Sequence, residues 1–256
     1  MSTSTTADDL PPRTLPSVVR VLPSTRDVQH EATRIAAGIL RASHQRDVHL
    51  VLSGGSTPKG FHAYLGQEPD INWTRVHIWF GDERTVPPTH ADSNYRMARE
   101  TLLDLVTIPP ANIHRMQGEL PPDEAAHAYE RELRATFDLT DPTSAPPQFD
   151  LLILGMGDDG HTASLFPGTA ALSEHTRWVV ANAVPQQDTW RITLTWPVLN
   201  ASKHVLFLVT GANKQAALRA VFGDDASARP PAAGIQPAGE LLWLLDADAG
   251  AAFNAR

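Results

Sequence analysis

The sequence predicts an α/β fold built on a mostly parallel, Rossmann-like sheet with helices on both faces. Two observations lead to this prediction. Short apolar runs alternate with longer segments of helical period along most of the 256 residues. Several runs, such as LLIL at 151–154 and VLFLV at 205–209, are continuous rather than alternating, which is typical of strands covered on both faces.

Seven apolar runs are expected to form strands, and five segments between them are expected to form helices. The expected strands are Val18–Leu22, Val48–Leu52, Val76–Phe80, Asp150–Leu154, Trp178–Ala181, Val205–Val209 and Leu241–Leu245. The expected helices cover 27–43, 58–66, 93–106, 123–137 and 213–222. Ligands of such sheets bind at the carboxyl ends of strands, so the loops that follow the strands are the first places to look for chemistry.

The chain is expected to form a flexible tail over 1–16, rich in Ser, Thr, Pro and Asp, and a single domain over 17–256. The stretch 223–239 is a long loop that could serve as a mobile lid. The N-terminus lacks the apolar segment of a secretory signal, and no apolar run is long enough to span a membrane. We therefore expect a cytoplasmic protein without membrane contact, and a monomer by default.

The composition excludes several classes of function. The chain has no cysteine, which rules out disulfides, thiolate metal sites and a cysteine nucleophile. Its formal net charge is −8, and it contains no dense Lys/Arg run of the kind that would suggest a nucleic-acid partner. Neither H-E-x-x-H nor a calcium-loop pattern occurs, so no metal is expected. The G-x-S-x-G elbow of serine hydrolases is also missing.

The first loop with chemical character follows the strand at 48–52 and reads Ser53-Gly54-Gly55-Ser56-Thr57-Pro58-Lys59. Thr57 is expected to be the N-cap of the next helix and Pro58 its first residue. The glycines let the backbone approach a ligand closely, and a helix N-terminus attracts anions. The loop is either a phosphate site or an ordinary capped turn; it is not a Walker A loop, which ends in Gly-Lys-Ser/Thr.

A second loop, Gly155–Pro167, follows the strand at 150–154 and contains a literal G-x-G-x-x-G. Two features argue against a dinucleotide site. Asp158 and Asp159 lie where a pyrophosphate would approach, and the next expected strand leads to Asn182 rather than to an acid for the ribose. His161 is instead a candidate general base, because imidazole exchanges protons near neutral pH.

Charged residues in three further segments are candidates for substrate binding. Asp82 and Arg84 follow the strand at 76–80, and a guanidinium can bind a carboxylate or phosphate in bidentate fashion. Lys214 is expected in the first turn of the helix after the strand at 205–209, and Arg191 lies upstream of it. Taken one at a time, a solvated surface position explains each of these side chains better than a binding site does.

Together these segments resemble the 6-phosphogluconolactonase family, which is part of a wider group with the glucosamine-6-phosphate deaminases. The resemblance runs from about residue 18 to 250. The matching blocks are Leu52–Pro58, Phe80–Arg84 with Ser93–Arg96, Leu154–Pro167, Arg191–Thr195 and Val209–Lys214. In the deaminases a glutamate–proline pair follows the histidine and helps to open the sugar ring. Here the pair is Phe166-Pro167, which favours hydrolysis over deamination.

The resemblance implies hydrolysis of 6-phospho-D-glucono-1,5-lactone to 6-phosphogluconate, a step of the pentose phosphate pathway, by a single lactonase domain without a cofactor. It assigns His161 as the general base for the attacking water. It also implies that Arg84 binds substrate or stabilises negative charge near the lactone. The implied phosphate-binding residues are Gly54, Gly55, Ser56, Thr57, Lys214 and Arg191. Asp82 and Asp159 are expected to bind hydroxyls or to orient His161.

Three other functions remain open from the sequence. The first is an amino-sugar phosphate deaminase or isomerase on the same scaffold. The second is a non-catalytic sugar-phosphate sensor that kept only the anion-binding loops. The third is dinucleotide binding at 155–160, which saturable binding of NAD would support.

Overall fold

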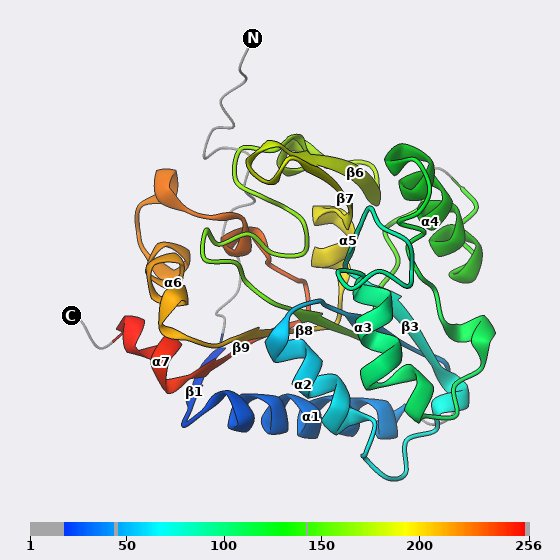
Figure 1. Ribbon diagram of the computed structural model, residues 1–256, viewed down its shortest axis with the longest axis horizontal. Helices are drawn as coiled ribbons and strands as arrows, with labels where there is room; N and C mark the ends of the chain where they lie inside the picture. The colour runs from blue at the N-terminus through cyan, green and yellow to red at the C-terminus, as the bar shows by residue number, and fades with distance from the viewer. Residues whose placement is uncertain (1–17, 44–45, 142, 254–256) are drawn as a thin grey trace.

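The computed structural model describes residues 18–43, 46–141 and 143–253. The expected tail over 1–16 lies outside the described residues. The described part of the chain contains one large parallel sheet and one small antiparallel sheet, with helices packed around them (Figure 1). None of the described helices has both the length and the apolar character needed to cross a membrane.

The large sheet is parallel throughout and confirms the predicted fold class. Its six strands follow the order β1 (Val18–Leu22), β9 (Glu240–Asp246), β8 (His204–Val209), β5 (Leu151–Leu154), β2 (Val48–Leu52) and β3 (Val76–Phe80). From β2 the chain first adds β3 on one side, and β5, β8 and β9 then follow on the other side. The order therefore reverses between β2 and β5, which is where ligands of open α/β sheets bind.

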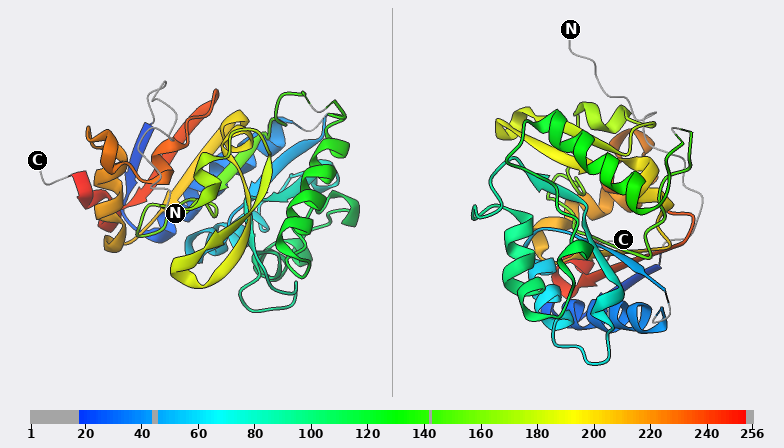
Figure 2. Two further views of the ribbon diagram at one scale, coloured as in Figure 1. Left: turned by 90° about the horizontal axis from the view of Figure 1, so that it is seen from above. Right: turned by 90° about the vertical axis from the view of Figure 1, so that its right-hand side faces the viewer.

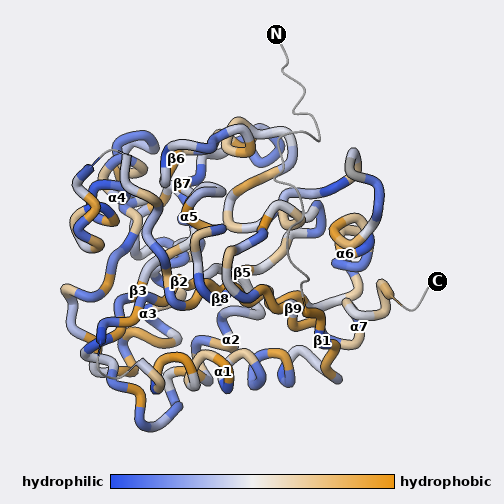
Figure 3. Tube along the Cα trace, turned by 180° about the vertical axis from the view of Figure 1, so that it is seen from behind, coloured by the Kyte–Doolittle hydropathy of each residue, from blue (hydrophilic) through white to orange (hydrophobic). Residues whose placement is uncertain are grey.

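Helices cover both faces of this sheet (Figures 1 and 2). One face carries α1 (Thr25–Ala42), α2 (Ser56–Leu65) and α3 (Asn94–Thr101). The opposite face carries α4 (Pro122–Thr136), α5 (Trp196–Ala201) and α6 (Gln215–Phe222), while α7 (Ala247–Gly250) follows β9. The central strands are the most hydrophobic part of the trace (Figure 3).

Two cores lie against the two faces, and they explain the continuous apolar runs. On β5, Leu152 and Leu154 belong to one core, whereas Leu151 and Ile153 belong to the other. Successive side chains of a strand point to opposite faces, so a strand covered on both faces needs apolar residues at every position.

The small sheet was only partly predictable. It contains β4 (Asp82–Arg84), β7 (Thr189–Leu194) and β6 (Val179–Val184), all paired antiparallel. The expected strand at Trp178–Ala181 corresponds to β6, but it belongs to this separate sheet rather than to the parallel one. β4 and β7 were missed. The three polar residues of β4 form a strand only through pairing with β7, about a hundred residues later in the chain.

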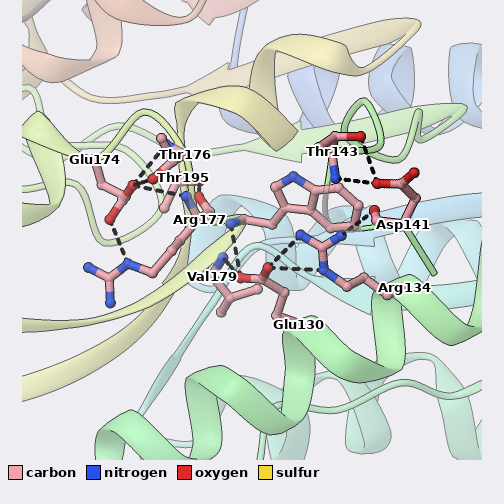
Figure 4. Close-up of polar contacts among 10 residues, drawn as sticks. Glu130, Arg134, Asp141, Thr143, Glu174, Thr176, Arg177, Val179 and Thr195 are labelled. Atoms are coloured by element: carbon pink, nitrogen blue, oxygen red, sulfur yellow. Dashed lines mark hydrogen bonds and ion pairs between the residues drawn. The ribbon is translucent and has the colours of Figure 1, made fainter. Parts of the chain in front are cut away.

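A polar contact ties α4 to the small sheet (Figure 4). Glu130 accepts hydrogen bonds from the backbone N–H groups of Trp178 at 3.0 Å and Val179 at 3.3 Å. Arg134 pairs with the same carboxylate at 2.9 Å, and its guanidinium lies 3.8 Å from the centre of the Trp178 ring. These contacts hold β6 of the small sheet against α4.

The sequence indicates a long loop over 223–239, but part of this stretch is regular. It contains two 3₁₀ turns, Ala226–Ala228 and Pro231–Gly234. The second turn is buried, and the N–H of Ala232 donates to the carbonyl of Gly160 at 2.9 Å. This half of the stretch is therefore packed against the loop after β5, and the lid remains a prediction.

Candidate active site

A cavity of about 430 Å³ lies at the carboxyl ends of β2, β5 and β8 and is faced by the small sheet. This is the edge of the sheet at which the strand order reverses. Nine of the ten predicted site residues line it: Gly54, Gly55, Ser56, Thr57, Asp82, Arg84, His161, Arg191 and Lys214. The tenth, Asp159, does not line the cavity but contacts His161.

The glycine loop begins its helix two residues earlier than predicted. α2 starts at Ser56, and Gly55 is its N-cap with φ of 102°. The expected N-cap Thr57 is therefore inside the first turn, where its hydroxyl lies 2.7 Å from that of Thr210. Gly55 turns the chain in a left-handed conformation that glycine adopts without strain, and among the described residues no side chain caps the first turn. The residues of this turn still line the cavity, where the start of a helix attracts anions.

Asn94 connects the glycine loop to β4. Its side-chain amide donates to the backbone carbonyl of Asp82 at 2.9 Å and to the Asp82 carboxylate at 3.2 Å. A Cβ at Gly54 would lie 2.1 Å from the Asn94 Oδ1, so only glycine permits this approach. Asp82 in turn accepts a hydrogen bond of 2.5 Å from Ser164 in the loop after β5.

Asn94 and Ser164 lie in blocks that carry the family resemblance, but no role was predicted for either residue. Both are buried polar residues, at 4% and 1% exposure, and both contact Asp82. Their positions within the blocks Ser93–Arg96 and Leu154–Pro167 were the only signal that could have identified them.

His161 is held on two sides. Its Nδ1 lies 2.6 Å from Asp159 Oδ1, and the same oxygen accepts the backbone N–H of His161 at 3.0 Å. The ring stacks on Phe166 with centroids 3.9 Å apart. A carboxylate next to Nδ1 fixes the proton on that nitrogen and leaves Nε2 as the basic atom.

Arg84 and Arg191 occupy directly opposed positions on β4 and β7. Arg84 donates from Nη1 to the carbonyl of Asp92 at 2.8 Å, and Arg191 donates to Gln187 Oε1 at 2.8 Å. Burial, together with the positive charge of Arg84, lowers the pKa of Arg191. The two guanidinium groups repel each other on one cavity wall, and an anion bound between them would offset that repulsion.

Lys214 provides a third cation at the cavity. It was expected in the first turn of a helix, and it is the last residue of the 3₁₀ turn Ala212–Lys214, immediately before α6. Its ammonium pairs with Asp158, which also accepts a hydrogen bond of 2.8 Å from Asn213. These contacts lower the pKa of Asp158. Within the described ranges, no group of three or more His, Cys, Asp or Glu residues is placed to hold a metal ion.

The fold and the cavity together define an α/β enzyme whose cleft suits a small anionic substrate. The model of the glucosamine-6-phosphate isomerases/6-phosphogluconolactonase family matches residues 24–243. The chain belongs to this family.

Individual relatives and solved structures agree with that membership. The 6-phosphogluconolactonase of a Synechocystis species is 46% identical over 203 residues, which are 78% of this chain and 82% of the relative. The enzyme of that name from Haemophilus influenzae is 38% identical over 224 residues, 85% of this chain and 93% of the relative. The structure of the 6-phosphogluconolactonase from Trypanosoma cruzi superposes with a TM-score of 0.83 at 30% identity, covering 94% of this chain and 98% of the other.

Proposed function

We propose that the chain hydrolyses 6-phospho-D-glucono-1,5-lactone to 6-phosphogluconate, with His161 as general base. The observation that carries this proposal is the Asp159–His161 pair beside a cleft with three cations. The relatives named 6-phosphogluconolactonase support the choice of substrate.

His161 activates the attacking water in this mechanism. Nε2 accepts a proton from water as its oxygen bonds to the lactone carbonyl carbon, while Asp159 stabilises the imidazolium that forms. The tetrahedral adduct then collapses, the bond between the carbonyl carbon and the ring oxygen breaks, and the ring oxygen receives a proton from the imidazolium. The carboxylic acid that results ionises, so the reaction consumes one water and releases one proton.

The remaining cavity residues bind and orient the substrate. The N–H groups of the glycine loop, with Lys214 and Arg191, supply the donors for the phosphate. Arg84 binds negative charge of the substrate or the charge that develops at the lactone, and Asp82 accepts from a hydroxyl. Binding energy from the distant phosphate holds the ring against His161.

Phe166 supports hydrolysis rather than deamination. Its ring stacks on His161 at the position where the resemblance places the ring-opening glutamate of a deaminase. A lactone has no hemiacetal ring to open and no amine to expel, so the reaction does not need that carboxylate.

The test is hydrolysis of freshly generated 6-phosphogluconolactone, corrected for spontaneous opening. Replacing His161 by alanine should lower kcat by roughly 10²- to 10⁴-fold, because the general base is lost. His127→Ala, which removes an exposed histidine of α4, is the matched control and should retain wild-type activity. Full activity in the His161 variant would exclude it as the base. Tight binding of 6-phosphogluconate without any turnover would instead indicate a sensor.

A further inference from the structure

Glu83 is a buried carboxylate between two residues of the cavity wall. It is 2% exposed, while its neighbours Asp82 and Arg84 on β4 both line the cavity. Side chains alternate along a strand, so Glu83 points away from the cavity toward α3. No role in the proposed reaction has been assigned to it.

Four neutral donors converge on this carboxylate. Oε1 accepts the backbone N–H groups of Arg84 and Asn94, each at 2.8 Å. Oε2 accepts the N–H of Tyr95 at 2.9 Å and the hydroxyl of Ser93 at 3.0 Å. Ser93 is the N-cap of α3, so Glu83 satisfies the first N–H groups of that helix.

The segment 92–95, at the start of α3, also holds the guanidinium of Arg84. Asp92 directly precedes the N-cap, and its carbonyl accepts Nη1 of Arg84 at 2.8 Å. Both ends of Arg84 are thereby fixed: the backbone N–H bonds to Glu83, and the guanidinium bonds to a segment that Glu83 anchors. The result is a closed ring of contacts from Glu83 through residues 92–95 to the Arg84 side chain.

Arg84 requires such a tether because Arg191 lies directly opposite it on β7. Like charges at opposed positions of an antiparallel pair repel each other. An unrestrained Arg84 side chain would rotate away from Arg191 into solvent. Burial raises the pKa of Glu83, and the hydrogen bonds from Tyr95, Asn94 and Arg84 oppose that rise.

We infer that Glu83 is a positioning residue for substrate binding, which holds the Arg84 guanidinium in the cavity beside Arg191 through its contacts with Ser93, Asn94 and Tyr95. The inference rests on the proposed function for the identity of the substrate. It adds a residue outside the cavity that acts on the substrate through Arg84, which it holds by way of the start of α3.

Glu83→Gln tests the inference at constant volume. The amide nitrogen that replaces one oxygen is a donor and faces two donors, so two of the four contacts are lost. The dissociation constant of 6-phosphogluconate, measured by calorimetry, should rise roughly 5- to 50-fold, as expected when a buried hydrogen-bond partner is removed. The same variant should change KM and kcat for the lactone in the same proportion as Arg84→Ala does, although by less.

A double-mutant cycle separates positioning from general destabilisation. In the Arg84→Ala background, Glu83→Gln should weaken binding by less than about twofold, because its effect acts through Arg84. Full additivity of the two losses, or wild-type binding in the Glu83 single variant, would overturn the inference. Calorimetry needs no turnover, so a wild-type protein that binds 6-phosphogluconate but leaves the lactone intact would refute the proposed function alone.

Two further variants complete the test. Asp150→Asn removes a carboxylate that is also 2% exposed but pairs with Arg46 and Lys203, outside the cavity. It should lower the melting temperature and leave the dissociation constant unchanged. If the Glu83 variant does not fold, Ser93→Ala removes only one of the four donors and should weaken binding roughly two- to fivefold. That loss should also disappear in the Arg84→Ala background, and its persistence there would count against the inference.

Discussion

Two adjacent aspartates in the loop after β5 contact different parts of the site. Asp158 pairs with Lys214, whereas Asp159 accepts from the ring and backbone of His161. Neither aspartate lines the cavity. Their effects on catalysis should therefore be separable, one through binding and the other through the base.

Asp159→Asn should lower kcat by roughly 10- to 10³-fold and change KM by less than about threefold. The amide oxygen still accepts the backbone N–H of His161, but the negative charge that stabilises the imidazolium is lost. A loss confined to the chemical step lowers kcat and kcat/KM equally. Initial rates of lactone hydrolysis over a range of substrate concentrations measure both constants.

Asp158→Asn is the control for that variant, because it removes the neighbouring charge in the same loop. Its carboxylate competes with the substrate for Lys214, so KM should fall a few-fold while kcat stays within about twofold of wild type. A large drop in kcat for this variant would mean that the whole loop, rather than the carboxylate of Asp159, supports His161.

At the scale of the element, the loop after β5 brings the base and its partner together by a close backbone approach. The N–H of Gly157 donates to the carbonyl of His161 at 2.9 Å. A Cβ at position 157 would lie 2.1 Å from His161 Nδ1 and 2.6 Å from Asp159 Oδ1. The loop closes over the histidine–aspartate pair only because this position has no side chain.

Gly157→Ala should therefore displace the His161 ring and lower kcat by roughly tenfold or more, since a misplaced base works poorly. Gly155→Ala is the matched control, because a Cβ there would meet only Ser53 Oγ, at an ordinary contact of 4.0 Å. Lactone hydrolysis by the two variants compares them directly. Equal losses would show that the loop tolerates no added methyl group, whatever its distance from His161.

The sequence predicted the large sheet well, because its strands follow from local hydrophobicity. Val18–Leu22, Val48–Leu52 and Val76–Phe80 form strands with the predicted bounds. β4 was not predictable in this way, since Asp82–Arg84 is polar and becomes a strand only by pairing with β7. The start of α2 was misplaced, because the backbone angle of Gly55 decides it and no side-chain pattern reveals that angle.

The cavity residues were largely predictable from strand-end loops and from the family resemblance, but their supporting contacts were not. Histidine and arginine are common in catalytic and anion-binding sites, and the positions of His161 and Arg84 after strands made them candidates. Glu83 supports Arg84 through α3, and nothing in the linear sequence shows which of the two acids at 82 and 83 faces the cavity. That distinction depends on how β4 pairs with β7 and packs on α3.

At the scale of the whole molecule, the protein has a negative net charge, whereas its cleft carries an excess of positive charge. The formal net charge is −8, yet Arg84, Arg191 and Lys214 lie on the wall of one cavity. These three cations outnumber the one carboxylate that lines the cavity within the described residues, that of Asp82, and such a local excess of charge attracts oppositely charged ligands even when the net charge of the protein is unfavourable.

A buried and a half-buried histidine make the stability of the whole fold sensitive to acid. His62 of α2 is fully buried, and burial lowers its pKa from 6.5 to about 3. His49 of β2 lies beside His77 and against Phe137, the C-cap of α4, and burial together with the His77 charge lowers its pKa from 6.5 to about 4. Both remain neutral in the folded protein at pH values where the unfolded chain already binds protons.

The free energy of unfolding should therefore be unaffected by these histidines above about pH 6.5. It should fall as the pH drops from there toward 4, because the unfolded state takes up more protons than the folded state in this window. Between pH 7 and 5 the two histidines should cost at most on the order of 4 kcal/mol, or a decrease in Tm of roughly 5–15 °C. Asp150, whose pKa is held near 2 against burial by Arg46 and Lys203, adds a second loss only below about pH 4.

His62→Leu isolates the first loss, because leucine fills a similar volume and binds no proton. The variant should be more stable than wild type at pH 5 and show about half of the wild-type decrease in Tm between pH 7 and 5. Calorimetric melting at several pH values measures this, with His127→Leu on the exposed face of α4 as control. If the His62 variant kept the entire wild-type decrease, its burial as the neutral form would not be the source of the acid sensitivity.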